Sequence, residues 1–193
     1  MDGTPFTSLE RRWMAIVTFA GGIDTTRNML VTCMHKLATS PELQTAIRGR
    51  QERINAFIEE MLRLDGSVQG ITRVAASDVA LEGGSLLPRG ANLIVSVGSA
   101  NRDPEIWEDP DEFQMDRANI NRHIAFGVGR HLCIGMHLAR SELQIAIRLL
   151  LDRLSDIRLA IPESEVDWVP APYFRQILNL PVKFSSATDR SEP

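Results

Sequence analysis

The segment that most constrains this chain is Phe126–Gly135, a loop with three glycines that carries one cysteine, Cys133. Gly127 and Gly129 permit positive φ angles and a tight turn, and the last glycine leaves space beside the sulfur for a large flat group. Apolar residues then recur close to helical spacing, which predicts a helix over residues 136–154. The cysteine is therefore expected at or just before a helix N-terminus, where the helix dipole and unpaired N–H groups stabilise a thiolate.

A thiolate of this kind can serve as a nucleophile, a metal ligand or a disulfide partner. The other cysteine, Cys33, lies 100 positions earlier in a helical stretch, so the two cannot form a zinc cluster or a Cys-x-x-Cys redox pair. His131 is near Cys133 in sequence, but a residue two positions away on a loop need not face the sulfur as a base would. Two uses remain: a single axial thiolate on haem iron, and a buried structural cysteine in a glycine-rich turn.

The same loop matches the pattern F-G-x-G-x-H-x-C-x-G, which resembles the haem-binding loop of the cytochromes P450. The resemblance implies that the cysteine is the axial ligand of haem b and that the other typed residues contact the cofactor. It also implies that the phenylalanine shields the proximal face of the haem and that the histidine donates to a haem propionate. The residues at the typed positions are Phe126, Gly127, Gly129, His131, Cys133 and Gly135.

The composition is that of an ordinary globular domain, with 44% hydrophobic and 24% charged residues in 193. A net charge of −4 and scattered arginines give no indication of nucleic-acid binding. The best candidate for a membrane span, residues 13–20, is well short of the roughly 20 residues required, so no membrane anchor is expected. With two cysteines and no export signal, the sequence predicts a cytoplasmic protein.

A long helix is predicted over residues 7–38, because Thr7 opens a T-x-x-E capping box and Ser40-Pro41 begins another helix. Its middle, Gly21–Thr26, is locally weak. Two glycines cost roughly 1 kcal/mol each relative to alanine, and Thr25 can donate a hydrogen bond to the carbonyl one turn earlier. Taken alone, these small residues either let another helix pack closely or serve a site.

Considered together with the cysteine loop, the weak segment Gly21–Thr26 resembles the distal-helix motif of the cytochromes P450, which lies over the haem. The resemblance implies that Asp24 and Thr25 are the oxygen-activation pair, and that the glycines give room to dioxygen and substrate. A hydroxyl and a carboxylate can hold and relay the protons that this chemistry needs. By alignment with the pocket regions of the family, the expected substrate contacts are Val17, Gly21, Val68, Gly70, Tyr173 and Phe174.

Glu60 and Arg63 lie three positions apart on a predicted amphipathic helix, so they are neighbours on its surface. A lone E-x-x-R is weak evidence, since most such pairs are solvated and contribute under about 1 kcal/mol. Its place in the chain resembles that of the E-x-x-R pair of the family, which implies a buried structural role. Many members complete this pair with an arginine where Glu112 stands here. Arg102 and Arg117 are both candidates to replace that arginine.

Short apolar runs separated by turns predict a small β region over residues 65–100. It resembles the β segment that borders the substrate pocket of the family, which implies that Arg73 donates to a haem propionate. The alternative is a surface arginine on a strand. A short helix is expected around residues 104–107.

The expected fold is mainly α with a small β portion, the C-terminal haem-binding half of the cytochrome P450 fold, in one partial domain over residues 1–193. Its expected segments are the distal helix at about 7–38, the E-x-x-R helix at about 51–64, the small β region at 65–100, the meander and cysteine loop at 101–135, a helix at 136–154, a C-terminal β region at 157–184 and a polar, frayed tail at 185–193.

The resemblance covers residues 6–184, and a complete member of the family carries roughly as much sequence again before the distal helix. One hypothesis is a soluble, bacterial-type monooxygenase that inserts one atom of dioxygen into a small apolar organic substrate. Its electrons would come from NAD(P)H through an iron–sulfur ferredoxin or a flavin donor. The alternative is a non-catalytic fragment, or one half of a split enzyme that needs a partner chain for the N-terminal half.

The apolar residues of the distal helix cover nearly its whole circumference instead of one stripe. With no preceding half to cover them, several of their side chains are expected to face water in this chain. The residues concerned are Trp13, Met14, Ile16, Val17, Phe19, Met29, Leu30 and Val31.

Overall fold

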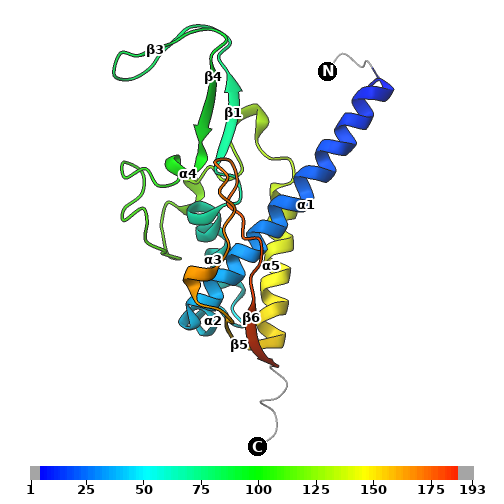
Figure 1. Ribbon diagram of the computed structural model, residues 1–193, viewed down its shortest axis with the longest axis vertical. Coiled ribbons are helices and arrows are strands. Elements are labelled where there is room, and N and C mark those ends of the chain that lie inside the picture. Colours follow the sequence, from blue (N-terminus) through cyan, green and yellow to red (C-terminus); the bar gives the residue numbers. More distant parts are fainter. Residues whose placement is uncertain (1–4, 187–193) are drawn as a thin grey trace, which may run out of the picture.

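The computed structural model describes residues 5–186 and shows a helical core that carries three small antiparallel sheets (Figure 1). The long N-terminal helix is α1, Ser8–Thr39. Its capping box forms as predicted, because the Glu10 N–H donates to Thr7 Oγ1 at 3.2 Å and the Thr7 N–H donates to Glu10 Oε2 at 2.7 Å. The next helix, α2, Pro41–Ile47, begins with the expected proline.

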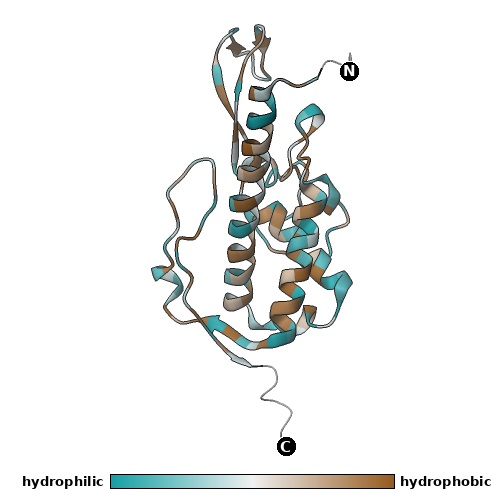
Figure 2. Cartoon of the chain, turned by 90° about the vertical axis from the view of Figure 1, so that its right-hand side faces the viewer, coloured by the Kyte–Doolittle hydropathy of each residue, from teal (hydrophilic) through white to brown (hydrophobic). Residues whose placement is uncertain are grey.

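The core forms where the second half of α1 packs against α3, Gln51–Asp65, and α5, Met136–Arg153. Both views place α1 and α5 side by side (Figure 1, Figure 2). Strand β5, Leu154–Leu159, follows α5 directly and also contacts α1. Burial of each large side chain here contributes about 1.5–3 kcal/mol. The buried core includes Met29, Cys33, Leu37, Phe57, Ile58, Met61, Leu143, Ile147, Leu151 and Ile157.

The β region after α3 consists of two two-stranded sheets, where the sequence predicts one small sheet. Its elements are β1, Gly70–Val74; β2, Val79–Ala80; β3, Leu86–Leu87; β4, Asn92–Ser96; and the short helix α4, Val97–Ala100. β1 pairs with β4, and β2 pairs with β3 across a turn in which Gly83 and Gly84 have φ angles of 87° and 85°. β4 ends in α4 because Ser96 Oγ accepts the Ser99 N–H at 3.2 Å.

The segment between α4 and α5 contains turns and two short 3-10 helices, η1, Ile120–Arg122, and η2, Gly129–His131. The short helix expected at residues 104–107 is absent, and hydrogen-bonded turns take its place. Trp107 is buried there, and its indole Nε1 donates to Ala100 O at 3.2 Å while its backbone N–H donates to Asp103 O at 2.8 Å.

The C-terminal β region is a single antiparallel pair of β5 with β6, Val182–Ser186. A 3-10 helix, η3, Glu163–Glu165, lies on the connection between them. β6 therefore extends two residues into the expected tail, and the rest of that tail, residues 187–193, lies outside the described residues. Within residues 5–186, no helix is both long enough and apolar enough to cross a membrane.

The first half of α1 extends away from the core (Figure 1), and hydrophobic and hydrophilic residues alternate along it (Figure 2). Phe19, for example, is 74% exposed. Of the residues expected to face water, Met29 is instead buried, and Leu30 and Val31 are half-buried, because the core of this chain covers them. The exposed apolar residues of this part of α1 are Leu9, Trp13, Met14, Ile16, Val17, Phe19 and Ile23.

We expect the 193-residue chain, expressed alone, to self-associate and to bind a dye that reports exposed apolar surface. Each uncovered large side chain forgoes about 1.5–3 kcal/mol of burial. The double variant Trp13→Gln, Phe19→Gln should lower both signals in sedimentation and fluorescence measurements, whereas Arg12→Gln on the same helix should leave them unchanged. A monomeric wild type with no dye binding would contradict this expectation.

Candidate functional site

The cysteine loop, Phe126–Gly135, is closed by its own backbone. The Cys133 N–H donates to Phe126 O at 3.0 Å, and the Leu132 N–H donates to Gly129 O at 3.0 Å. Gly127 and Gly129 have φ angles of 73° and 71°, a region that L residues rarely adopt. The loop thus brings the cysteine to a position just ahead of α5, as the sequence predicts.

The Cys133 thiol is exposed and lies in an apolar part of the surface. A Cβ added at Gly135 would lie 3.9 Å from Cys133 Sγ, so any larger residue there would begin to cover the sulfur. Ile134, next to the thiol, is 96% exposed. Other exposed apolar residues around the loop are Val128, Leu132 and Leu138. A thiol with these neighbours can accept a large flat apolar group. Because Cys133 is exposed, the alternative of a buried structural cysteine is wrong.

The weak segment of α1 keeps its helical form, and Thr25 makes the expected bond. Thr25 Oγ1 donates to Gly21 O at 2.7 Å, one turn earlier. Asp24 is exposed and lies 3.4 Å from Arg27 in an ion pair. No described residue approaches within 4 Å of the Cβ positions of Gly21 and Gly22, so the helix face beside the hydroxyl is open.

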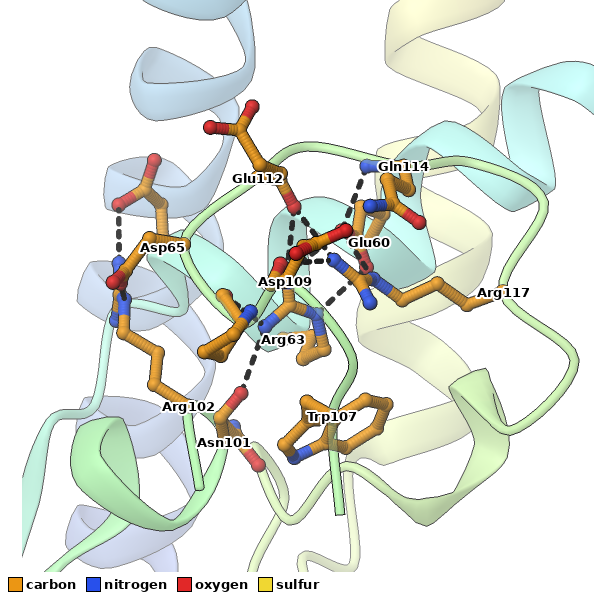
Figure 3. Close-up of polar contacts among 12 residues, drawn as sticks. Glu60, Arg63, Asp65, Asn101, Arg102, Trp107, Asp109, Glu112, Gln114 and Arg117 are labelled. Carbon is orange, nitrogen blue, oxygen red and sulfur yellow. Dashed lines mark hydrogen bonds and ion pairs between the residues drawn. The ribbon is translucent and has the colours of Figure 1, made fainter. Parts of the chain in front are cut away.

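Glu60 and Arg63 form a fully buried ion pair, with neither side chain exposed to solvent (Figure 3). Arg63 Nε and Nη2 each donate to a different carboxylate oxygen of Glu60 at 2.8 Å. Arg63 also donates to the carbonyls of Asn101 and Pro110 at 2.8 Å, which fixes the segment that follows α4. The pair therefore ties α3 to residues far along the chain.

Arg117 is the arginine that completes this pair (Figure 3). The sequence alone does not decide between Arg102 and Arg117. Its Nε donates to Glu60 Oε1 at 3.0 Å, and its Nη2 donates to Glu112 O at 2.7 Å. Arg102 instead pairs with Asp65 at 3.6 Å and Asp111 at 3.1 Å, near the surface. Glu112, which stands where many members of the family have an arginine, thus contributes only its backbone carbonyl. The guanidinium comes from Arg117, five residues later.

Four of the six expected substrate contacts are brought together by pairing across two segments. Val68 forms an isolated β-bridge with Phe174, and the Gly70 N–H donates to Tyr173 O at 3.4 Å. A Cβ at Gly70 would lie 3.0 Å from the Ile94 side chain, so a larger residue would crowd this junction. The other two, Val17 and Gly21, lie on the exposed part of α1.

The two expected propionate donors have exposed side chains. Arg73 lies on β1, and its Nη1 donates to the neighbouring Thr72 O at 2.8 Å. His131 ends η2 in the cysteine loop. Because a guanidinium carries five N–H donors, Arg73 keeps donors for another acceptor.

A second carboxylate on α3, Glu59, makes contacts that the sequence analysis missed. His123 Nε2 lies 2.9 Å from Glu59 Oε2, and Arg140 Nε donates to Glu59 Oε1 at 2.7 Å. Burial raises the pKa of Glu59, but the hydrogen bonds from His123 and Arg140 and the charge of Arg140 outweigh it and hold that pKa at about 2. The same hydrogen bond raises the pKa of Arg140. The cluster lines a surface pocket of about 630 Å³.

Comparison with known proteins gives consistent matches over almost the whole chain. The cytochrome P450 family model matches residues 1–165. The chain is 36% identical to the cytochrome P450 monooxygenase PikC of Streptomyces venezuelae over 95% of this chain and 44% of that protein. It is likewise 36% identical to nocardicin C N-oxygenase of Nocardia uniformis subsp. tsuyamanensis, over 94% of this chain and 46% of the relative.

The fold gives the same result. The structure of cytochrome P450 CYP109Q5 from Chondromyces apiculatus superposes with a TM-score of 0.89 at 32% identity, over 97% of this chain and 47% of that one. The chain thus spans less than half the length of these relatives. Since the family model covers well over half of the chain, and the mainly α fold with small sheets is that of its structural neighbours, the chain belongs to the cytochrome P450 family.

Proposed function

We propose that this chain supplies the haem-ligating and oxygen-activating part of a P450-type monooxygenase. The activity proposed is insertion of one atom of dioxygen into a small apolar organic substrate. The observation that carries the proposal is the exposed Cys133, held on a glycine-closed loop ahead of α5 in which Val128, Leu132 and Ile134 are also exposed. A thiolate in an apolar environment is the donor that haem iron takes in this family.

The residues of the chain fit a haem b. The open space at Gly135 and the apolar side chains beside Cys133 suit a flat porphyrin. In this proposal Phe126 shields the proximal face, while Arg73 and His131 hold the two propionates through charge-assisted hydrogen bonds. When bound, the haem would supply the oxygen chemistry, with electrons from NAD(P)H through a ferredoxin or flavin donor.

Proton delivery is assigned to Asp24 and Thr25. Because the Thr25 hydroxyl hydrogen is held by Gly21 O at 2.7 Å, its oxygen lone pairs remain available to fix a water on the open helix face. Asp24, exposed and beside Arg27, can exchange protons with solvent and pass them to that water. Val17, Val68, Gly70, Tyr173 and Phe174, with Gly21, are the proposed substrate contacts.

A second function, one half of an enzyme completed by a separate chain, is favoured by the exposed apolar surface of α1. Several large side chains there have no cover from residues 5–186. A chain with the remaining length of the relatives would provide that cover and close the distal side of the site. Both readings place the protein in the cytoplasm, where the unpaired thiols of Cys33 and Cys133 stay reduced.

Thr25→Ala tests the oxygen-activation role in an assembly that turns over. Haem content and substrate binding should remain near wild type, while most of the electrons are diverted to hydrogen peroxide, because the proton-bearing water is no longer held. Thr25→Ser keeps the hydroxyl and should restore most of the coupling. The measurement is product and peroxide formed per NAD(P)H oxidised, and unchanged coupling in Thr25→Ala would contradict the assignment.

A further inference from the structure

We infer that Glu59, with His123 and Arg140, positions the cysteine loop and thereby sets where the Cys133 thiolate is presented. The three residues are called the Glu59 cluster. This inference deepens the proposed function, because it rests on Cys133 as the haem ligand. None of the three is a catalytic residue: their contacts are with one another and with the backbone and ring of the loop.

One carboxylate holds both ends of the loop. Arg140 donates to Glu59 through Nε at 2.7 Å and through Nη2 at 2.9 Å, a two-pronged contact with fixed geometry. His123 reaches Glu59 Oε2 at 2.9 Å. His123 lies before the loop and Arg140 lies after it, on α5, so α3 fastens the loop at its entrance and its exit. The side chain of His123 is 3% exposed and that of Glu59 is 17% exposed, so their contact is largely shielded from water, whereas Arg140 is 27% exposed.

Both partners of Glu59 then act on the residues that hold the cysteine. His123 Nδ1 accepts the Ala125 N–H at 3.3 Å, which leaves Nε2 as the ring nitrogen that faces Glu59 and donates to it. The Arg140 guanidinium lies 4.6 Å from the centroid of the Phe126 ring, a cation–π contact. Phe126 O accepts the Cys133 N–H at 3.0 Å. Glu59 on α3 is therefore linked to the cysteine in three steps. His123 contacts Ala125, Arg140 contacts the adjacent Phe126, and the Phe126 carbonyl binds the Cys133 N–H.

The neighbouring Glu60 serves a different segment, which separates the two roles. Glu60 binds Arg63 and Arg117 and so fixes the meander, whereas Glu59 binds His123 and Arg140 on either side of the cysteine loop. Loss of the Glu59 charge would leave Arg140 without its carboxylate and His123 with a weaker acceptor. The Phe126 ring would then keep its packing against the core but lose a well-oriented guanidinium, and the thiol would sample more positions.

The test uses Glu59→Gln, which keeps the shape and removes the charge, with Glu52→Gln, an exposed glutamate of the same helix, as the control. Hydrogen exchange of the haem-free chain, followed by mass spectrometry, should be at least tenfold faster in peptides covering residues 123–136. Peptides from 51–64 should be unchanged. Exchange that rises equally in all helices, or that does not rise at the loop, would overturn the inference.

A second readout follows the thiolate itself. In haem-loaded Glu59→Gln, a part of the reduced carbon monoxide complex should lose the red-shifted Soret band, while Glu52→Gln keeps it in full. Arg140→Lys, which retains the charge but loses the two-pronged contact, should show the same partial loss. A full band in Glu59→Gln and Arg140→Lys would refute the positioning role. Absence of the band in the wild type would instead refute the ligand role of Cys133. The hydrogen-exchange experiment would still test whether Glu59 holds the loop, because it uses the haem-free chain.

Discussion

Replacing Cys133 by serine is expected to abolish the red-shifted Soret band of the reduced, carbon monoxide-bound protein. A serine hydroxyl is not ionised at neutral pH, so it cannot replace a thiolate on haem iron. The thiol is exposed at the start of α5, so the substitution removes a ligand without opening a cavity in the core. The expected effect is complete loss of the band, measured as a difference spectrum after reconstitution with haem b.

Cys33→Ala is the matched control for this substitution. Cys33 lies in the core with no exposed surface, far from the cysteine loop in the sequence. Its replacement should lower stability, by about 1 kcal/mol for the small cavity, and leave the band in place. If Cys33→Ala and Cys133→Ser behave alike, or if wild type takes up haem without the band, Cys133 is not the axial ligand.

Arg117→Ala should be strongly destabilising. It removes one cation from the fully buried Glu60 carboxylate and leaves the carbonyls of Asp109 and Glu112 short of a donor. Removal of one partner from a buried ion pair costs about 3–5 kcal/mol. The free energy of unfolding in urea should fall by that amount.

Arg102→Ala is the control that discriminates the two candidate arginines. Its partners, Asp65 and Asp111, lie nearer the surface, with the Asp111 side chain 82% exposed. An exposed pair of this kind contributes less than about 1 kcal/mol. An equal or larger loss of stability in Arg102→Ala would mean that the triad is completed by Arg102.

Local signals in the sequence account for the parts of the fold that were predicted correctly. The capping box at Thr7 sets the start of α1 within its own first turn, and the proline at residue 41 marks the next helix. The hydrogen bond from Thr25 to Gly21 O likewise spans four residues and follows from residue type. The small β region was recognised from alternating runs and turns, but how its strands pair into sheets depends on contacts between them.

The parts that the sequence leaves open or does not reveal depend on contacts between residues far apart in the chain. Arg117 meets Glu60 across 57 positions, and Arg140 meets Glu59 across 81, so no periodicity or spacing reports them. An arginine is common on helix surfaces, and nothing local distinguishes Arg140 from its neighbours. The short helix predicted at residues 104–107 is wrong: the segment forms hydrogen-bonded turns, and the buried Trp107 ring is held by a bond to Ala100 O, seven residues earlier.

Because Cys33 is completely buried and Cys133 is exposed, the number of reactive thiols reports both folding and haem occupancy. Burial raises the pKa of the Cys33 thiol, with a smaller contribution from Asp65, so the group stays protonated and inaccessible to thiol reagents. A reagent that titrates sulfur should therefore count one thiol in the folded, haem-free chain, at Cys133. It should count two after unfolding and none when iron occupies the exposed sulfur. A single colorimetric titration thus separates three states of the protein without any assay of turnover.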